Sequence, residues 1–160
     1  MRSGGYPSPS TPYVTAIMRA NRGRNTGPEL RLRRLLHAAG HRYRVNYPIR
    51  LDERGPILVD IAFPRVGLAV LVDGCFWHSC PLHGSRPKAN AEYWTAKLAR
   101  NMERDSETTT RLGLAGWVVA RFWEHEPPSD LAPRISLMLE ELTRIMDDKE
   151  AASAERRVWP

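Results

Sequence analysis

The chain contains little cysteine and no long apolar segment. Only two of its 160 residues are cysteines, Cys75 and Cys80, too few for a scaffold held together by disulfides. Its unbroken apolar runs reach about six residues at most, far below the roughly 20 that a membrane-spanning helix needs. The first residues also lack the apolar stretch of a secretory signal. We therefore expect a protein of the reducing cytoplasm, and the length favours one domain.

Positive charge is in excess. Lysine and arginine number 24 against 18 aspartates and glutamates, which gives a net charge of +6. This balance suits a polyanionic partner such as double-stranded DNA. On charge alone, a basic protein with a solvated surface is an equally good interpretation.

Composition divides the chain into three parts. Residues 1–12 are rich in Ser, Pro and Gly and are expected to form a disordered tail. Residues 13–149 carry the regular apolar patterns and are expected to form the single domain. Residues 150–160 are expected to be a frayed C-terminal tail.

The patterns predict helices around a sheet. Thr26-x-x-Glu29 is a capping box that predicts a helix from Thr26 to Gly40. Residues 57–63 and 68–72 are apolar runs joined by a short turn, so we expect an antiparallel hairpin. Further strands are predicted near 43–47 and 117–123. A helix over 91–114, and another beginning at a Ser129 cap, complete an α/β fold with helices on both faces of a mixed sheet.

Metal ligands and aromatic residues are concentrated in one loop. The spacing Cys75-x4-Cys80-x2-His83 offers three ligands of the kind that bind zinc. Phe76 and Trp77 lie inside the segment that such an ion would clamp. This arrangement suits a rigid apolar wedge held at the surface.

Two carboxylates interrupt or end the hairpin strands. Asp60 lies within the first run and Asp73 ends the second. A carboxylate among buried apolar residues is costly unless it is paired or binds a cation. Since the strands pair, we expect the two residues to converge on Mg²⁺, which prefers oxygen ligands; a partly exposed Asp60 is the alternative.

The predicted helix 91–114 carries polar residues four apart. Lys97, Asn101 and Asp105 therefore share one face. From spacing alone, solvated charge pairs are the simpler interpretation of that face. Apolar residues at the same interval are expected to pack on the core: Trp94, Leu98 and Met102.

A set of short motifs then appears in a recognisable order. They are Met18-Arg19-Ala20, Thr26-x-Pro28-Glu29, Gly74-Cys75-Phe76-Trp77-His78, Asn101-x-Glu103-Arg104-Asp105 and Trp123-Glu124. Over residues 13–126 the chain resembles the very-short-patch-repair (Vsr) DNA mismatch endonucleases.

The resemblance implies a fold and an activity. Members have the restriction-endonuclease-like PD-(D/E)xK fold, bind catalytic Mg²⁺ and structural Zn²⁺, and nick DNA 5′ of the thymine in a T:G mismatch. It also implies a bacterial protein, associated with the nucleoid when bound to DNA. We expect a monomer that is functionally linked to a cytosine-5 DNA methyltransferase or to repair proteins.

Matching residues inherit expected roles. Asp60 corresponds to the essential Mg²⁺-binding aspartate and His78 to the catalytic histidine that activates water, while Glu29 and Asp105 correspond to supporting acidic residues. The expected DNA-binding residues are Met18, Arg19, Arg22, Arg24, Phe76, Trp77, Lys88, Lys97 and Asn101.

Three of these assignments have alternatives. Phe76 and Trp77 could be core residues. Glu29 could serve only as a helix cap. His78 could be a zinc ligand, because Cys75-x2-His78 is a usable spacing.

Two departures from the family pattern matter. In the family a cysteine follows the late Trp-Glu, but here His125 stands there, so we expect the zinc ligands to be Cys75, Cys80, His83 and His125. Asp73 replaces a histidine of the mismatch enzymes. The lysine of the general nuclease pattern is absent, so His78 or Lys97 must substitute.

The leading hypothesis is therefore a Mg²⁺-dependent endonuclease that nicks near T:G mismatches, with Mg²⁺ bound by Asp60 and Asp73. A restriction or defence endonuclease that cuts specific or modified DNA without mismatch dependence is the second. A zinc-stabilised DNA-binding module without catalysis is the third.

Overall fold

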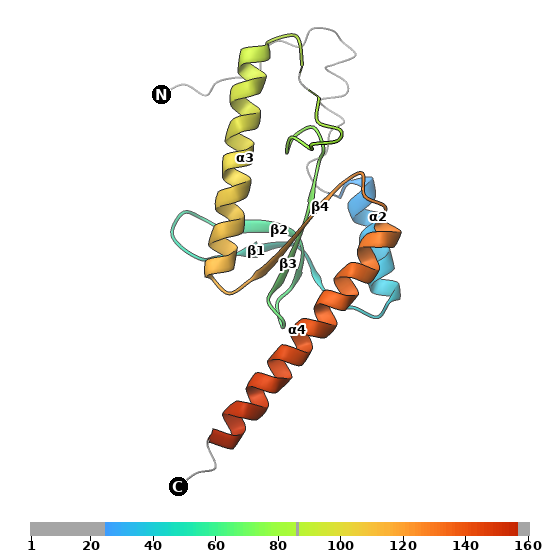
Figure 1. Ribbon diagram of the computed structural model, residues 1–160, viewed down its shortest axis with the longest axis vertical. Helices are drawn as coiled ribbons and strands as arrows, with labels where there is room; N and C mark the ends of the chain where they lie inside the picture. The colour runs from blue at the N-terminus through green and yellow to red at the C-terminus, as the bar shows by residue number, and fades with distance from the viewer. Residues whose placement is uncertain (1–24, 86, 157–160) are drawn as a thin grey trace.

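Four strands form one mixed sheet in the order β1-β2-β3-β4 (Figure 1). The structure is a computed structural model, and it describes residues 25–85 and 87–156. Along the chain the elements are α2 (Gly27–Ala38), β1 (Arg44–Ile49), β2 (Ile57–Phe63), β3 (Leu68–Asp73), α3 (Ala91–Leu114), β4 (Val118–Trp123) and α4 (Pro128–Arg156). The first two pairings are antiparallel, and β3 pairs with β4 in parallel.

The predicted cap of the first helix is present. Thr26 caps α2, and its hydroxyl accepts a hydrogen bond from the Glu29 N–H at 3.5 Å. The Glu29 carboxylate accepts from the backbone N–H of Asn25 rather than from that of Thr26. The helix closes just before Gly40, whose φ of +86° a residue with a side chain rarely adopts.

The predicted hairpin of β2 and β3 is confirmed, with one irregularity at Asp60. The pairs run from Phe63↔Leu68 to Ile61↔Val70. Val59 packs on one face of the sheet, whereas Ile61 packs on the other. Strict alternation would put these two residues on the same face, so the strand turns over at Asp60.

Each face of the sheet has its own core. Apolar residues of α2 and α4 cover one face, where Leu32, Leu36, Leu131 and Ile135 pack on Ile61 and Val70. On the other face, Leu112 of α3 packs on Val59, Ala69 and Leu71. The prediction of a mixed sheet with helices on both faces is confirmed.

Helix α3 has the predicted bounds but not the predicted buried face. Trp94 and Leu98 are buried, whereas Met102 is 53% exposed. Each step of four residues rotates the side chain by about 40°, so Met102 has turned away from the core. Eighteen residues complete five turns, which explains why Leu112 is buried instead.

Helix α4 starts earlier and ends later than predicted. It begins at Pro128, so Ser129 lies inside the first turn and is not its cap. It continues past Lys149, the predicted end of the domain, to Arg156, and its C-terminal half extends beyond the sheet (Figure 1). Among the described helices, none combines the length and apolar character needed to cross a membrane.

Candidate active site

A guanidinium lies beside the end of strand β3. The parallel register sets Leu71 opposite Arg121 and Asp73 opposite Trp123. Arg121 and Asp73 therefore project from the same face of the sheet. Arg121 donates from Nε and Nη2 to the two oxygens of the Asp73 carboxylate, each at 2.7 Å. This bidentate pair is largely buried, since the Asp73 side chain is only 10% exposed.

Helix α3 supplies a second carboxylate to the same guanidinium. Asp105 Oδ1 lies 3.0 Å from Arg121 Nη2, and Asp105 Oδ2 lies 2.5 Å from His78 Nδ1. An ionised carboxylate only accepts hydrogen bonds, so Nδ1 carries the proton in the neutral ring. His78 Nε2 is then the ring nitrogen that can accept a proton from a substrate or a water molecule.

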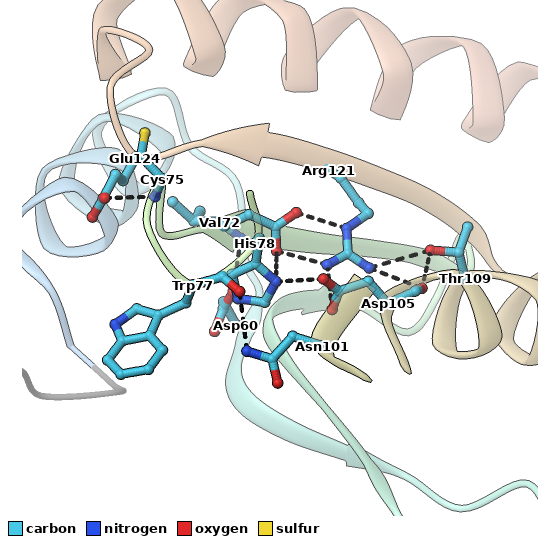
Figure 2. A network of polar contacts seen from close by, with 11 residues as sticks. Asp60, Val72, Cys75, Trp77, His78, Asn101, Asp105, Thr109, Arg121 and Glu124 are labelled. Atoms are coloured by element: carbon cyan, nitrogen blue, oxygen red, sulfur yellow. Dashed lines mark hydrogen bonds and ion pairs between the residues drawn. The ribbon is translucent and has the colours of Figure 1, made fainter. Parts of the chain in front are cut away.

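The side chains of His78, Asp105 and Arg121 point toward one another (Figure 2). Together with Asp73 they line one cleft of about 270 Å³. Four polar residues and two apolar ones form its walls: Asp73, His78, Asp105, Arg121, Met102 and Trp123. The cleft therefore combines an oriented imidazole with buried charge and an apolar wall. A cleft with an oriented imidazole beside ionisable groups is a candidate active site.

Asp60 does not line this cleft but lies next to it in the fold. Its Oδ2 accepts a hydrogen bond of 2.8 Å from the Val72 N–H, beside Asp73. Burial raises the pKa of the Asp60 carboxyl to about 6. The charges of Glu29 and Asp73 contribute to this rise, while the Val72 hydrogen bond and Arg33 oppose it. An ionised Asp60 would therefore gain from an added cation.

We expected Asp60 and Asp73 to bind one Mg²⁺ ion together, and the structure agrees with only part of this expectation. Asp73 is near enough to influence the pKa of Asp60, but both of its oxygens already have a cationic partner in Arg121. Direct coordination of Mg²⁺ by Asp73 stays a prediction, and this geometry does not favour it.

Glu29 is buried and serves more than the helix cap. The residue is 3% exposed, and its Oε2 lies 2.9 Å from Arg33 Nη2. Arg33 also donates to the Asp60 carbonyl oxygen at 3.4 Å. The alternative that Glu29 is only a cap is wrong, because it also belongs to a buried ion pair behind Asp60.

Two cysteines and two histidines meet outside this cleft. The ligand atoms of Cys75, Cys80, His83 and His125 all lie within 4.8 Å of one another. Cys75 Sγ lies 3.1 Å from His125 Nδ1. Burial, reinforced by Cys80, raises the pKa of the Cys75 thiol to about 11. The group is a candidate tetrahedral metal site, and His78 is not part of it.

The two loop aromatics are half-buried and touch each other edge to face. Their ring centroids are 5.0 Å apart, and Phe76 lies 5.4 Å from buried Trp94. Asn101 donates from Nδ2 to the Trp77 carbonyl oxygen at 3.0 Å. Asn101 and Asp105 thus face the loop, so a fully solvated face for this part of α3 is wrong.

The other predicted DNA-binding residues are less informative. Lys88 is exposed, and Lys97 is half-buried. Met18, Arg19, Arg22 and Arg24 lie outside the described residues.

Comparison with known proteins places the sequence in one family. The sequence matches the family described as DNA mismatch endonuclease Vsr over residues 13–82. The type II nicking enzyme V.NaeI of Lentzea aerocolonigenes is 45% identical over 128 residues, covering 80% of this chain and 77% of the relative. The type II nicking enzyme V.NmeDIP of Neisseria meningitidis serogroup C is 36% identical, with coverages of 85% and 87%. The DNA mismatch endonuclease Vsr of Escherichia coli K12 is 34% identical, with coverages of 86% and 85%.

The chain belongs to the Vsr family. This Vsr-family protein is a DNA endonuclease, so the hypothesis of a binding module without catalysis is wrong. The mismatch dependence of its cleavage is a separate question, because the relatives include both nicking enzymes and a mismatch endonuclease.

Sequence reasoning missed Arg121 in this Vsr-family site. A signal was present, because Arg121 is a lone charge in the apolar run 117–123. Asp60 was selected by that same criterion. The partner of Arg121 could not be read from the sequence, since it depends on the parallel register of β3 and β4.

Proposed function

We propose that the protein nicks duplex DNA beside a T:G mismatch by Mg²⁺-dependent hydrolysis of a phosphodiester bond. The observation that carries the proposal is the orientation of His78 by Asp105, next to the half-buried carboxylate of Asp60. The half-buried Phe76 and Trp77 on the same loop support it. Relatives named as nicking enzymes and as a mismatch endonuclease support it too.

His78 is proposed as the general base. Its Nδ1 is tied to Asp105, so Nε2 takes the proton of the attacking water. A positioned base of this kind contributes about 10² to 10⁴ in rate. Glu29 supports the site indirectly through Arg33, which contacts the Asp60 carbonyl.

Asp60 is proposed as the principal protein ligand of catalytic Mg²⁺. The residue fits this role because its raised pKa reports a carboxylate whose charge the protein only partly balances. A divalent cation bound there supplies charge neutralisation at the scissile phosphate. Asp73 contributes negative charge nearby.

Phe76 and Trp77 are proposed as the wedge that enters the base stack. Parting two base steps costs a few kcal/mol, and a mispair costs less than a matched pair. Asn101 and Trp94 would hold the wedge in place from α3. Lys88 and Lys97 are proposed to contact the backbone of the duplex, together with Arg19, Arg22 and Arg24. Met18 is proposed to enter the duplex from the N-terminal segment.

The Cys75, Cys80, His83 and His125 group is proposed to bind structural Zn²⁺. Two thiolates and two imidazoles fit its tetrahedral preference. We also propose that residues 13–149 form a single PD-(D/E)xK domain, which the mixed sheet with helices on both faces supports. Monomeric action and a functional link to a cytosine-5 DNA methyltransferase remain part of this proposal.

Nicking at a particular duplex site without mismatch dependence is the second candidate. Two relatives with higher identity than the E. coli enzyme are named as type II nicking enzymes, and their names mention no mismatch. This candidate uses the same catalytic residues and differs only in the substrate that the wedge accepts.

One experiment separates the two candidates. Duplexes that differ only in one T:G or T:A pair are incubated with the protein in Mg²⁺ or in EDTA, and both labelled strands are mapped. The proposal expects one Mg²⁺-dependent nick, 5′ of the mismatched thymine. Equal cleavage of both duplexes supports the second candidate. The same assay is run with Asp60→Asn, which removes the proposed Mg²⁺ ligand. Asp130 is an exposed carboxylate of α4, so Asp130→Asn is the matched control.

A further inference from the structure

We infer that Arg121 is a positioning residue, which locks Asp105 and Asp73 around His78 and keeps the imidazole oriented for catalysis. This inference rests on the proposed role of His78 as general base. No sequence motif assigned Arg121 a role, but its contacts do.

The N–H donors of Arg121 face acceptors inside the protein. A guanidinium has five N–H groups. Four hydrogen bonds run to Asp73 Oδ1 and Oδ2, to the Asp105 carbonyl oxygen and to Thr109 Oγ1, at 2.7–3.3 Å (Figure 2). The fifth contact is the ion pair with Asp105 Oδ1 at 3.0 Å. Arg121 is therefore not available to bind a phosphate, despite lining the cleft.

The contacts fix Asp105 at both its side chain and its backbone. Thr109 Oγ1 donates to the Asp105 carbonyl at 2.9 Å, and Arg121 Nη1 donates to the same oxygen at 3.1 Å. With Oδ1 facing Arg121, Asp105 Oδ2 is aimed at His78 Nδ1. The orientation of His78 thus depends on a side chain that does not contact it.

One cation balances two carboxylates that face the same ring nitrogen. His78 Nδ1 lies 2.5 Å from Asp105 and 3.6 Å from Asp73. Without Arg121, these two carboxylates would repel each other at short range. The Asp105 side chain would then turn away, and His78 would lose its fixed partner.

Lysine cannot replace this arginine. A planar guanidinium binds one carboxylate with two parallel hydrogen bonds and still has donors for other groups, whereas an ammonium is a point charge. Asp73 is then best understood as the counterion that aligns Arg121. The sequence suggested a metal-binding role for Asp73 because the residue lies close to Asp60.

The test compares Arg121→Ala and Arg121→Lys with wild type and with Arg54→Ala. Arg54 is an ion-paired but exposed arginine outside the cleft, so it controls for the loss of a surface ion pair. Single-turnover nicking and duplex Kd are measured separately on the duplex that wild type cleaves best. We expect both Arg121 variants to lose about 10- to 100-fold in rate, as orienting partners typically do, with Kd changed less than about twofold.

Two further readouts exclude a merely structural role. Millimolar guanidinium chloride should restore part of the rate of Arg121→Ala and leave wild type and Arg54→Ala unchanged. In ¹⁵N-histidine spectra, with His78 assigned from His78→Gln, wild type should show the neutral ring protonated at Nδ1. Both Arg121 variants should lose this preference. The spectra need no substrate, so they test the inference even if the proposed cleavage fails.

Three results would overturn the inference. One is a rate within about twofold of wild type in folded Arg121→Lys. Another is a loss that appears in duplex Kd rather than in rate, which would make Arg121 a DNA contact. The third is an unchanged His78 tautomer in the variants. If Arg121→Ala does not fold, the lysine variant decides.

Discussion

Asp60 and Asp73 lie on paired strands, and the two regions around them differ in how negative charge is balanced. Arg121 neutralises Asp73 with two hydrogen bonds of 2.7 Å. At Asp60 the protein provides a backbone N–H and a weaker influence from Arg33, and burial raises the pKa to about 6. Asp73 therefore has a cationic partner within the protein, whereas the charge of an ionised Asp60 is only partly balanced, as expected for the proposed Mg²⁺ ligand.

The Cys/His group formed by Cys75, Cys80, His83 and His125 resembles the Asp60 region, because burial raises the pKa of an acidic side chain in both. Burial raises the pKa of the Cys75 thiol to about 11, so the thiolate needs a metal to form at neutral pH. The loop between Asp73 and His83 would thus be held by a metal through Cys75, Cys80 and His83, and by Arg121 through Asp73. Substitutions that perturb these regions one at a time test the difference between them.

The largest effect is expected from Asp60→Asn. The change keeps the shape and an acceptor for the Val72 N–H but removes the charge proposed to bind Mg²⁺. We expect a loss of more than about 10³-fold in nicking rate, several kcal/mol of transition-state stabilisation. Strand-mapped single-turnover assays measure it, with Asp130→Asn as control. A residual rate within about tenfold of wild type would contradict the assignment.

Removing a ligand of the Cys/His group should destabilise the fold. For Cys75→Ser we expect loss of bound zinc and a Tm lower by about 10 °C, because a structural site contributes folding free energy directly. Metal analysis and thermal melting measure the two effects. His125→Gln, which removes a histidine of the group, should have the same effect. His37 is an exposed histidine of α2, so His37→Gln serves as the control for the loss of a histidine. A zinc-free wild type with the same Tm as Cys75→Ser would contradict the prediction.

The wedge should affect selectivity more than it affects the chemical step. Trp77→Ala is expected to lower the preference for T:G over T:A duplexes by about tenfold, since one apolar contact between base steps contributes on the order of 1–3 kcal/mol. Leu82→Ala removes an apolar side chain that is 76% exposed in the same loop and should leave the ratio unchanged. Equal loss on both duplexes would instead assign Trp77 to general binding.

The smallest effect is a pH-dependent gain in stability for Asp60→Asn without metal. The folded pKa of Asp60, about 6, lies above its ordinary value of 3.8, so the folded state binds more protons between these values. Wild-type stability should therefore fall as pH rises from about 4 to about 6, and the loss should persist above. We expect the variant to melt about 4 °C higher at pH 7.5 and at the same temperature near pH 3.5. A constant difference across this range would argue against a perturbed Asp60.

Local patterns predicted the local structure well. The Thr26 cap, the hairpin turn and the bounds of α3 all follow from short-range spacing and were confirmed. Met102 was misplaced because a period of four drifts away from the 3.6-residue helical repeat over two steps. Helical rotation also puts Asn101 and Asp105 within about 20° of the Trp94 direction, which the pattern of charges concealed.

The catalytic arrangement was predictable only in its residue types. Asp60, Asp73, His78 and Asp105 were selected from the sequence, and the structure brings the last three into one cleft. The position of Asp60 outside that cleft could not be derived from alternation, because β2 is irregular there and Val59 and Ile61 face opposite sides. The partner of Asp73 depends on a strand 48 residues away in the chain. Neither the irregularity of β2 nor the pairing of Asp73 with Arg121 produces a periodic pattern in the sequence.

Metal binding by three proteins tests the comparison most directly. Mn²⁺, as a probe for Mg²⁺, is titrated by calorimetry into wild type, Asp60→Asn and Asp73→Asn, each bound to a duplex with an uncleavable linkage. The predicted result is loss of the site in Asp60→Asn and an affinity within about threefold of wild type in Asp73→Asn. Equal loss in both variants would show that the two carboxylates share one metal ion, and would contradict the account.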